Sequence, residues 1–384
     1  MPFSKIARRF CVRSLTKTPR LYNLVVDLAE RPVTPAPAGI DVTSGEPADD
    51  RTLAWIDECF GGAWSSEAHA GINVIARRGG VAVGFATVDP KGLTYAWLDG
   101  IARERGTGIF GPFGVAQDER KTELGRVLLA RALDVLRERG FARALIPAVG
   151  DERLVRYYRD AAGARVAEEF DRVTLLRPRR RVLFMASGNG SNFQAVADAV
   201  QSGDLPLEIA GIVVNDERAF AIERAKKAGI GVRSIVWNRS AEARSQYDER
   251  LVDGARASGA DLVLLLGWMH LLSDGFVAAF PELINLHPAF LPLDPQRDEV
   301  VFPDGAQTAA FRGAHAVRDA LAASAPWVGA TVHRVTNSTD RGPVLVRKPL
   351  RVERAEEEAG LMWRVHAVER EIVRDGLMRW LYQR

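Results

Sequence analysis

The second half of the chain alternates short apolar runs with stretches in which apolar residues recur at helical spacing. The apolar runs at residues 182–185, 207–214 and 262–266 predict buried strands. Helical patterns lie between these runs and begin at about Asn192, Ala221 and Ala243. Nearly continuous apolar strands separated by helices are typical of a mostly parallel sheet covered on both faces. We therefore expect a doubly wound α/β domain, in which ligands bind outside the carboxyl ends of the strands.

The first half has a different pattern and predicts a separate, mixed α/β unit. A helical stretch at residues 50–60 and strands at 73–76 and 81–88 precede a long amphipathic stretch. Further upstream, residues 21–28 carry apolar and polar positions at helical spacing.

Two breaks in composition predict the domain boundaries. A proline-rich run at 31–39 and the basic run RPRRR at 177–181 are sequences that rarely occur inside a helix or strand. We assign residues 1–39 to a basic N-terminal segment and proline-rich linker, 40–178 to the first domain and 179–384 to the second.

Composition narrows the functional classes. With 52 Lys and Arg against 49 Asp and Glu, the net charge of +3 is too small to predict nucleic-acid binding. Cys11 and Cys59 can form neither a zinc cluster nor a disulfide framework, so we expect no metal and a reducing compartment. No window approaches the ~20 apolar residues of a membrane span, and we expect a cytoplasmic protein without membrane contact. The basic first twenty residues fit either a transit peptide or a solvated segment on the first domain.

The sequence VLFMASGNGSNFQAV predicts a strand, a glycine-hinged turn and a helix in direct succession. Gly188 and Gly190 permit backbone angles that other residues avoid, and Ser191 or Asn192 can cap the helix. Backbone N–H groups and the helix dipole then favour an anion at one spot. GNGSN is neither the P-loop nor the dinucleotide fingerprint, so a turn that uses glycines for geometry alone is the alternative.

Asn285, His287 and Asp340 are the residues that we expect to carry chemistry. Asn285 and His287 lie two apart in ELINLHP, so a strand points both side chains to one face. Acyl transfer to an amine needs a donor for the oxyanion, a proton shuttle and a group that tunes the shuttle, and an amide, an imidazole and a carboxylate supply these. The alternative is that they satisfy backbone groups at a strand end and in a turn.

Residues 181–384 resemble the glycinamide ribonucleotide formyltransferase family. The resemblance rests on seven segments in the order and approximate spacing of that family, SGNGSNFQAV, GWMHLLS, INLHPAFLP, FRGAHAVRDAL, GATVHRVT, TDRGPVL and RVHAVERE. It implies 10-formyltetrahydrofolate as the formyl donor and a primary amine as the acceptor. It also matches the family's catalytic residues to Asn285, His287 and Asp340.

The same resemblance implies binding residues for both ligands. The phosphate of the nucleotide substrate would be held by Gly190, Ser191 and Asn192. Glu369 would meet the ribose hydroxyls, and the pterin would be held by Met269, Leu271 and Leu272. The residues alone leave open a solvated carboxylate for Glu369 and core packing for the three apolar positions.

The chain departs from the family pattern at three places. His270 stands where the family usually has arginine, and Val317 stands where a second histidine is common. An extra segment, residues 293–310, lies between Pro292 and Phe311 beside the expected acceptor pocket. Its acids and prolines predict an ordered surface loop or a lid, which could change the acceptor.

Residues 40–176 resemble the GNAT acetyltransferase superfamily, through GPFGVAQDERKTELGRVLLARALDVL and the segment after it. The resemblance implies a turn for the pyrophosphate of acetyl-CoA that begins at Arg120 and ends at Gly125. Glu123 stands where that superfamily prefers glycine. Tyr158 matches a tyrosine that protonates the leaving thiolate, with simple packing as the alternative. An active acetyltransferase, a degenerate scaffold and a sensor all remain open.

We therefore expect a two-domain fusion that moves a formyl group to the amine of a phosphorylated small molecule, glycinamide ribonucleotide of purine biosynthesis being the first candidate. In this mechanism protonated His287 and Asn285 stabilise the oxyanion, and Asp340 keeps the imidazole charged. The alternatives are an amino-sugar nucleotide or hydroxyornithine as acceptor, acetyl-CoA-dependent N-acetylation by the first domain, and a non-enzymatic folate- or nucleotide-binding regulator. The oligomeric state stays open.

Overall fold

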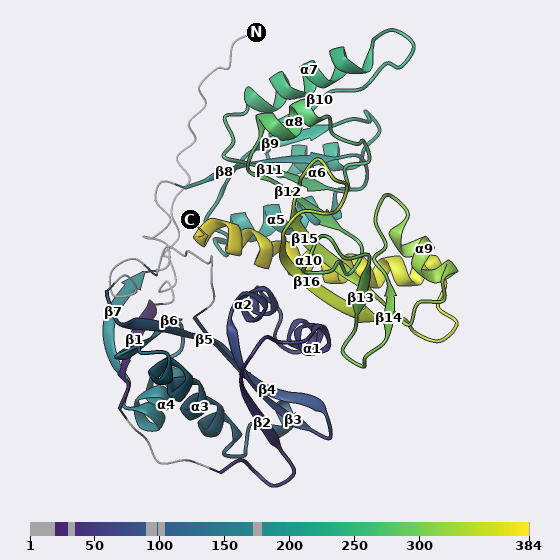
Figure 1. Ribbon diagram of the computed structural model, residues 1–384. Coiled ribbons are helices and arrows are strands. Elements are labelled where there is room, and N and C mark those ends of the chain that lie inside the picture. Colours follow the sequence, from purple (N-terminus) through teal and green to yellow (C-terminus); the bar gives the residue numbers. More distant parts are fainter. Residues whose placement is uncertain (1–19, 30–34, 90–97, 99–103, 172–178, 384) are drawn as a thin grey trace.

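The computed structural model describes residues 20–29, 35–89, 98, 104–171 and 179–383, which build two α/β domains in contact with each other (Figure 1). Each domain has a seven-stranded sheet at its centre. The N-terminal half of the chain forms one sheet and the C-terminal half forms the other. The expected two-domain α/β architecture is confirmed.

The N-terminal sheet has the strand order β2-β3-β4-β5-β6-β1-β7, and its β5–β6 pairing is parallel whereas the others are antiparallel. Its strands are β1 (Arg20–Asp27), β2 (Asp41–Glu46), β3 (Ile72–Arg78), β4 (Val81–Val88), β5 (Thr107–Val115), β6 (Arg143–Val149) and β7 (Arg165–Asp171). The helices are α1 (Asp50–Phe60), α2 (Trp64–Ala70), the 3-10 helix η3 (Gln117–Glu119), α3 (Leu124–Glu138) and α4 (Glu152–Ala162). The helix predicted at 50–60 and the strands predicted at 73–76 and 81–88 are confirmed.

Residues 20–27 form a strand, so the helical spacing expected for 21–28 is wrong. β1 lies between β6 and β7 in the sheet. Leu24, Val25 and Val26 are all buried, because both faces of this strand are covered. The N-terminal sheet thus begins inside the segment that we expected to be a basic tail and linker.

The parallel strands β5 and β6 separate after a short paired stretch. Pairing covers residues 107–109 of β5 opposite 143–145 of β6. Beyond it, from Phe110 to Val115, β5 pairs with β4. The two strands therefore diverge toward their carboxyl ends.

The C-terminal sheet has the order β10-β9-β8-β11-β12-β15-β16. The strands are β8 (Arg181–Ala186), β9 (Glu208–Val214), β10 (Val232–Ser234), β11 (Leu262–Leu266), β12 (Leu283–His287), β15 (Trp327–Arg334) and β16 (Val344–Arg351). Neighbours from β10 to β12 pair in parallel, and β15 and β16 continue the sheet antiparallel. The carboxyl ends of β8, β11 and β12 therefore share one edge.

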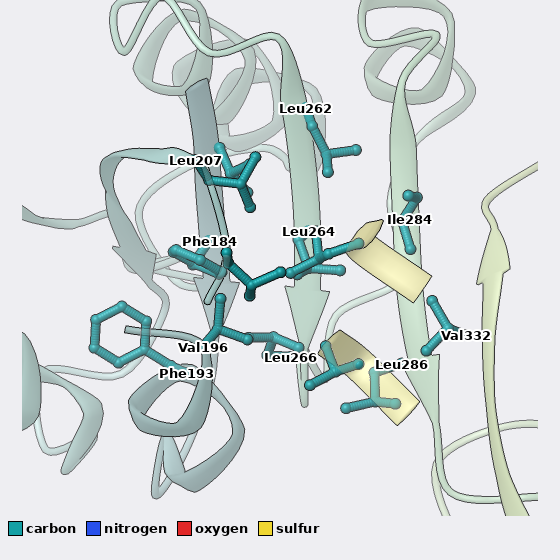
Figure 2. Close-up of a cluster of buried hydrophobic side chains, with 14 of the residues drawn as sticks. Phe184, Phe193, Val196, Leu207, Leu262, Leu264, Leu266, Ile284, Leu286 and Val332 are labelled. Carbon is teal, nitrogen blue, oxygen red and sulfur yellow. The ribbon is translucent and has the colours of Figure 1, made fainter. Parts of the chain in front are cut away.

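Helices cover both faces of this sheet, as the apolar strands predict. They are α5 (Ser191–Ser202), α6 (Ala221–Lys227), α7 (Arg244–Arg256), α8 (Asp274–Ala279), α9 (Ala316–Ala322) and α10 (Glu358–Tyr382). Figure 2 shows Phe184, Leu264 and Leu286 from three strands beside Phe193 and Val196 of α5, in a core that α6 and α10 also contribute to. Intervening strand residues pack on the other face against α7 and α8. The domain is doubly wound.

The extra segment at 293–310 folds into a hairpin of β13 (Glu299–Val301) and β14 (Gln307–Ala309). Val300 and Phe302 are buried in one cluster with Trp327 and with Ala54 of α1. The segment is ordered, as expected, and half of its residues are exposed at the surface, while Val300 and Phe302 pack between the two domains.

A buried ion pair joins the domains beside this hairpin. Arg347 of β16 donates from Nε to Asp57 of α1 at 2.8 Å, and neither side chain is open to solvent. Arg347 also donates to the carbonyl of Leu291 at 2.8 Å. Burial raises the pKa of Asp57 to about 6, although the charge of Arg347 opposes the shift.

Candidate active site

The turn between β8 and α5 has the geometry of an anion site. Gly190 has φ of +72°, and a Cβ added there would lie 2.7 Å from the Cβ of Ala221, so the position requires glycine. Helix α5 begins at Ser191 without a side-chain cap or an acidic residue in its first turn. Its first N–H groups are therefore free to meet an anion beside the residues predicted for phosphate, Gly190, Ser191 and Asn192.

Glu369 on α10 lies against this turn. It is 4% exposed, and its Oε2 accepts from Nδ2 of Asn192 at 2.9 Å. The Nδ1 of His366 donates to the same oxygen at 2.7 Å, and this hydrogen bond raises the pKa of His366 against the opposing effect of burial. Glu369 is thus a buried, anchored carboxylate rather than a solvated one.

Asn285, His287 and Asp340 meet at the end of β12. Asp340 lies 3.5 Å from Nδ1 of His287 through Oδ2, and its Oδ1 accepts from Nδ2 of Asn285 at 3.4 Å. The Nε2 of His287 donates to the carbonyl of Phe311 at 2.9 Å, which leaves Nδ1 as the nitrogen facing the carboxylate. An amide, an imidazole and a carboxylate therefore form one connected group.

His333 completes this group, and our sequence reasoning gave it no role. It lies on β15 directly opposite Asn285. Its Nε2 is 3.3 Å from the amide nitrogen of Asn285 and 3.5 Å from Oδ1 of Asp340, and its Nδ1 donates to the carbonyl of Arg334 at 2.8 Å. The signal that could have found it is its place in GATVHRVT, one of the segments that carry the family resemblance.

Burial and neighbouring charges act in opposite directions on the pKa values of His287 and Asp340. Burial lowers the pKa of His287, and Asp340 opposes this shift without reversing it. Burial raises the pKa of Asp340, but the hydrogen bond with His333, the charge of His287 and the N–H of Gly313 outweigh it and hold the pKa well below its usual range. These shifts favour an ionised Asp340 beside an imidazole that gives up its proton more readily than a free histidine, and the charge of His287 during the reaction stays a prediction.

The loops at the shared edge of the sheet connect these groups. The N–H of Met269, after β11, donates to Oγ of Ser187, after β8, at 2.9 Å. Glu369 is close enough to His287 for its charge to raise the pKa of the imidazole. The anion turn, the ionisable group and the segment after β11 thus surround one region.

Comparison with known proteins identifies the family. The sequence model of the formyl transferase family matches residues 180–377, about half of the chain. The chain belongs to the formyl transferase family. A phosphoribosylglycinamide formyltransferase from Escherichia coli (strain K12) is 31% identical over 192 residues, which cover 50% of this chain and 82% of that protein.

Two further relatives of the formyl transferase domain are similar. The phosphoribosylglycinamide formyltransferase of Mycobacterium tuberculosis (strain CDC 1551 / Oshkosh) is 33% identical over 196 residues, which cover 50% of this chain and 81% of that protein. A crystal structure of glycinamide ribonucleotide transformylase 1 from Symbiobacterium toebii is 29% identical and covers 53% of this chain and 88% of that one, with a TM-score of 0.47.

The segment predicted to hold folate in the formyl transferase domain has its apolar side chains open to solvent. Met269 is 56% exposed and Leu271 is 69% exposed, whereas Leu272 packs partly on the core. Core packing is therefore excluded for the first two. His270 stands at the position where the family usually has arginine. Its Nδ1 lies within hydrogen-bond distance, 3.1 Å, of the hydroxyl of Tyr247.

The N-terminal domain has a second candidate site, and the model of the acetyltransferase (GNAT) family matches residues 40–163. A cavity of about 670 Å³ opens where β5 and β6 diverge. Arg120, Gly125 and Tyr158, predicted to meet acetyl-CoA, all line it. The helix α3 starts beside it at Leu124. Glu123 has an ordinary φ of −74° and also lines the cavity, with its carboxylate 3.5 Å from Nε of Arg126.

Tyr157 is a second tyrosine of this cavity that sequence reasoning missed. Its hydroxyl is buried without a hydrogen-bond partner among the described residues. It packs over Gly125, where an added Cβ would lie 3.1 Å from it. Burial raises the pKa of Tyr157 to about 12 and also raises the pKa of Tyr158, so both hydroxyls keep their protons at neutral pH.

No described helix combines the length and apolar character needed to cross a membrane. Among the described residues no group of three or more His, Cys, Asp or Glu is arranged to hold a metal ion.

Proposed function

We propose that this formyltransferase moves the formyl group of 10-formyltetrahydrofolate to the primary amine of a phosphorylated small molecule, with glycinamide ribonucleotide as the first candidate. The contact of Asp340 with both His287 and Asn285 is the observation that carries the proposal. When bound, the donor supplies the formyl carbon and leaves as the free amine of its carrier.

The protonation of the resting site suggests how the proton moves. Nδ1 of neutral His287 takes a proton from the attacking amine as the bond from nitrogen to formyl carbon forms. Asp340 then stabilises the imidazolium at 3.5 Å. The long contacts of the Asn285 amide leave it able to turn a proton toward the oxyanion. The imidazolium returns its proton to the departing folate nitrogen, which leaves a formamide and tetrahydrofolate.

The anion turn supports a phosphorylated acceptor. Gly190, Ser191 and Asn192 would hold the phosphate through backbone N–H groups, and Glu369 would accept from ribose hydroxyls. His366 shares an oxygen of Glu369 with Asn192, so its raised pKa favours a cation beside the turn. Met269, Leu271 and Leu272 would hold the pterin, because two of them expose apolar surface at this edge.

A matched pair of acceptors tests this proposal. The purified full chain is incubated with 10-formyltetrahydrofolate and with glycinamide ribonucleotide or its dephosphorylated riboside, and the formamide is quantified. We expect multiple turnover with the phosphorylated amine and a kcat/KM lower by at least about tenfold for the riboside. Equal rates for both acceptors would contradict a phosphate site at the anion turn. A preference for an amino-sugar nucleotide or hydroxyornithine would show that glycinamide ribonucleotide is not the acceptor.

A second activity is favoured by the cavity between β5 and β6. We propose that it binds acetyl-CoA, with the amides between Arg120 and Gly125 at the pyrophosphate and Tyr158 at the sulfur. Calorimetry of acetyl-CoA with a His287→Ala variant tests this without interference from formyl transfer. Saturable binding supports the proposal, whereas the absence of a binding signal at millimolar acetyl-CoA would contradict it.

A further inference from the structure

The backbone of Asp340 has a conformation that its own sequence does not favour. Its φ of +51° lies in the left-handed region, which residues other than glycine adopt at a cost in free energy. Such a residue keeps this conformation only when its neighbours hold it. The neighbours of Asp340 therefore bear on the reaction, because 3.5 Å separates its carboxylate from the imidazole of His287.

The loop before α9 forms two hydrogen bonds with Asp340. Nε of Arg312 donates to the carbonyl of Asp340 at 3.3 Å. The N–H of the next residue, Gly313, donates to Oδ2 of Asp340 at 2.8 Å. One dipeptide thus fixes both the backbone and the carboxylate.

Asp298 of the hairpin segment ties this dipeptide to the other side of Asp340. Its Oδ1 accepts from Nη1 of Arg312 at 3.0 Å and also from the guanidinium of Arg341, the residue directly after Asp340. Arg312 donates further to the carbonyl of Arg297 at 2.7 Å, and Arg341 donates to that of Pro295 at 3.0 Å. Two arginines on either side of Asp340 are therefore anchored on the 293–310 segment.

That segment is in turn held by α1 of the N-terminal domain. Asp50 forms an ion pair with Arg297, and Nε of Arg51 donates to the carbonyl of Pro303 at 3.1 Å. Phe302 packs in the buried cluster that includes Ala54. A continuous set of contacts leads from α1 to Asp340.

We propose that Arg312 and Asp298 position Asp340 and that helix α1 of the N-terminal domain holds both in place. The inference rests on the proposed function, since it assumes that Asp340 acts in formyl transfer. It assigns the extra segment a role in catalysis through geometry, and it makes the N-terminal domain part of the formyltransferase.

Kinetics of graded variants test the inference in the full chain. Arg312→Ala lowers kcat at least about tenfold, because a small displacement of a reacting group costs this much, while both KM values change less than about threefold. Asp298→Asn gives a smaller loss of the same kind. Asp50→Asn lowers kcat only about two- to fivefold, as expected for a partly exposed ion pair. Arg318→Ala, an exposed arginine of α9 paired with Glu358, is the matched control and leaves kcat unchanged.

A titration readout separates positioning from general damage. Asp340 raises the pKa of His287, so a displaced carboxylate lowers it. In NMR titrations of the six histidines, Arg312→Ala and Asp298→Asn shift the signal lost in His287→Ala to a lower pKa, and Arg318→Ala does not. Asp298 is a solvent-exposed side chain, so its variant carries the test if Arg312→Ala fails to fold.

Two results overturn the inference, and each differs from failure of the proposed function. One is an unchanged kcat and an unchanged His287 pKa in folded Arg312→Ala and Asp298→Asn, while His287→Ala abolishes formyl transfer. The other is an equal loss in Arg318→Ala. If the wild-type chain and His287→Ala transfer formyl groups at the same rate, the proposed function itself fails and the inference fails with it.

Discussion

The site of the C-terminal domain and the cavity of the N-terminal domain differ in how their candidate residues are held. Asp340 contacts Asn285, His287, His333 and Gly313, and the last three contacts also lower the pKa of its carboxyl. In the N-terminal cavity, Tyr157 has a hydroxyl without a partner among the described residues. The comparison teaches that the hydrogen-bonded and charged contacts around Asp340 point to a particular type of reaction. The N-terminal cavity has polar groups without such contacts, and it indicates only the size and shape of a ligand.

Replacing the imidazole tests this contrast with the largest expected effect. His287→Ala lowers kcat about 10³-fold, because the proton acceptor is lost, whereas Tyr158→Phe leaves formyl transfer within about twofold. Steady-state formyl transfer measures both. His69→Ala, an exposed histidine on α2, serves as the control. A similar loss in Tyr158→Phe would mean that the two sites work as one.

Breaking the buried ion pair between Asp57 and Arg347, which joins the two domains, gives the next largest effect, on stability. Asp57→Ala leaves the guanidinium of Arg347 buried without its partner and lowers the free energy of unfolding by about 3–5 kcal/mol. Urea unfolding followed by tryptophan fluorescence measures it, with Asp160→Ala, at an exposed position of α4, as the control. Recovery in the double variant Asp57→Leu, Arg347→Met would assign the loss to the unpaired charge, and an unchanged stability of Asp57→Ala would contradict the buried ion pair.

Gly190→Ala tests the anion turn of the C-terminal site. The added Cβ meets Ala221 and the φ of +72° strains an alanine, so we expect a loss of about 1–3 kcal/mol of stability. The KM for the phosphorylated acceptor rises about tenfold as the N–H groups move. Gly188→Ala has open space for its Cβ and is the control. Equal KM values for both variants would contradict the claim that the turn binds the acceptor's phosphate.

Tyr157→Phe in the N-terminal cavity gives the smallest effect. Removing a buried hydroxyl without a partner among the described residues changes stability by less than about 1 kcal/mol and can raise it. Thermal unfolding measures this change. A loss well above this value would show that the hydroxyl has a partner and would weaken the contrast between the two sites.

The architecture of the C-terminal domain could be predicted because its strands are apolar on both faces and its helices separate them. The same property misled the prediction for residues 20–27. A strand buried on both faces has no alternation, and Leu24, Val25 and Val26 are successive apolar residues that also fit a helix.

The site could be predicted only in part, because contacts between distant residues depend on pairing. Asn285 and His287 share a face through their spacing alone. His333 lies opposite Asn285 through the antiparallel register of β12 and β15, and Asp340 reaches His287 from the loop after β15. No local pattern reveals either contact. The packing of Phe302 near Ala54 is hidden for the same reason, because each residue by itself predicts only burial. The roles assigned to the site residues stay predictions.

The pH dependence of kcat in the wild type and in Asp340→Asn tests most directly whether the carboxylate tunes the imidazole. Burial lowers the pKa of His287 and Asp340 opposes this, so wild-type kcat falls toward acid pH with an apparent pKa below about 6.5. In Asp340→Asn we predict a plateau about 10²-fold lower and an acid limb moved to lower pH, because the group that raises the imidazole pKa is gone. An acid limb that stays in place or moves to higher pH would contradict the account.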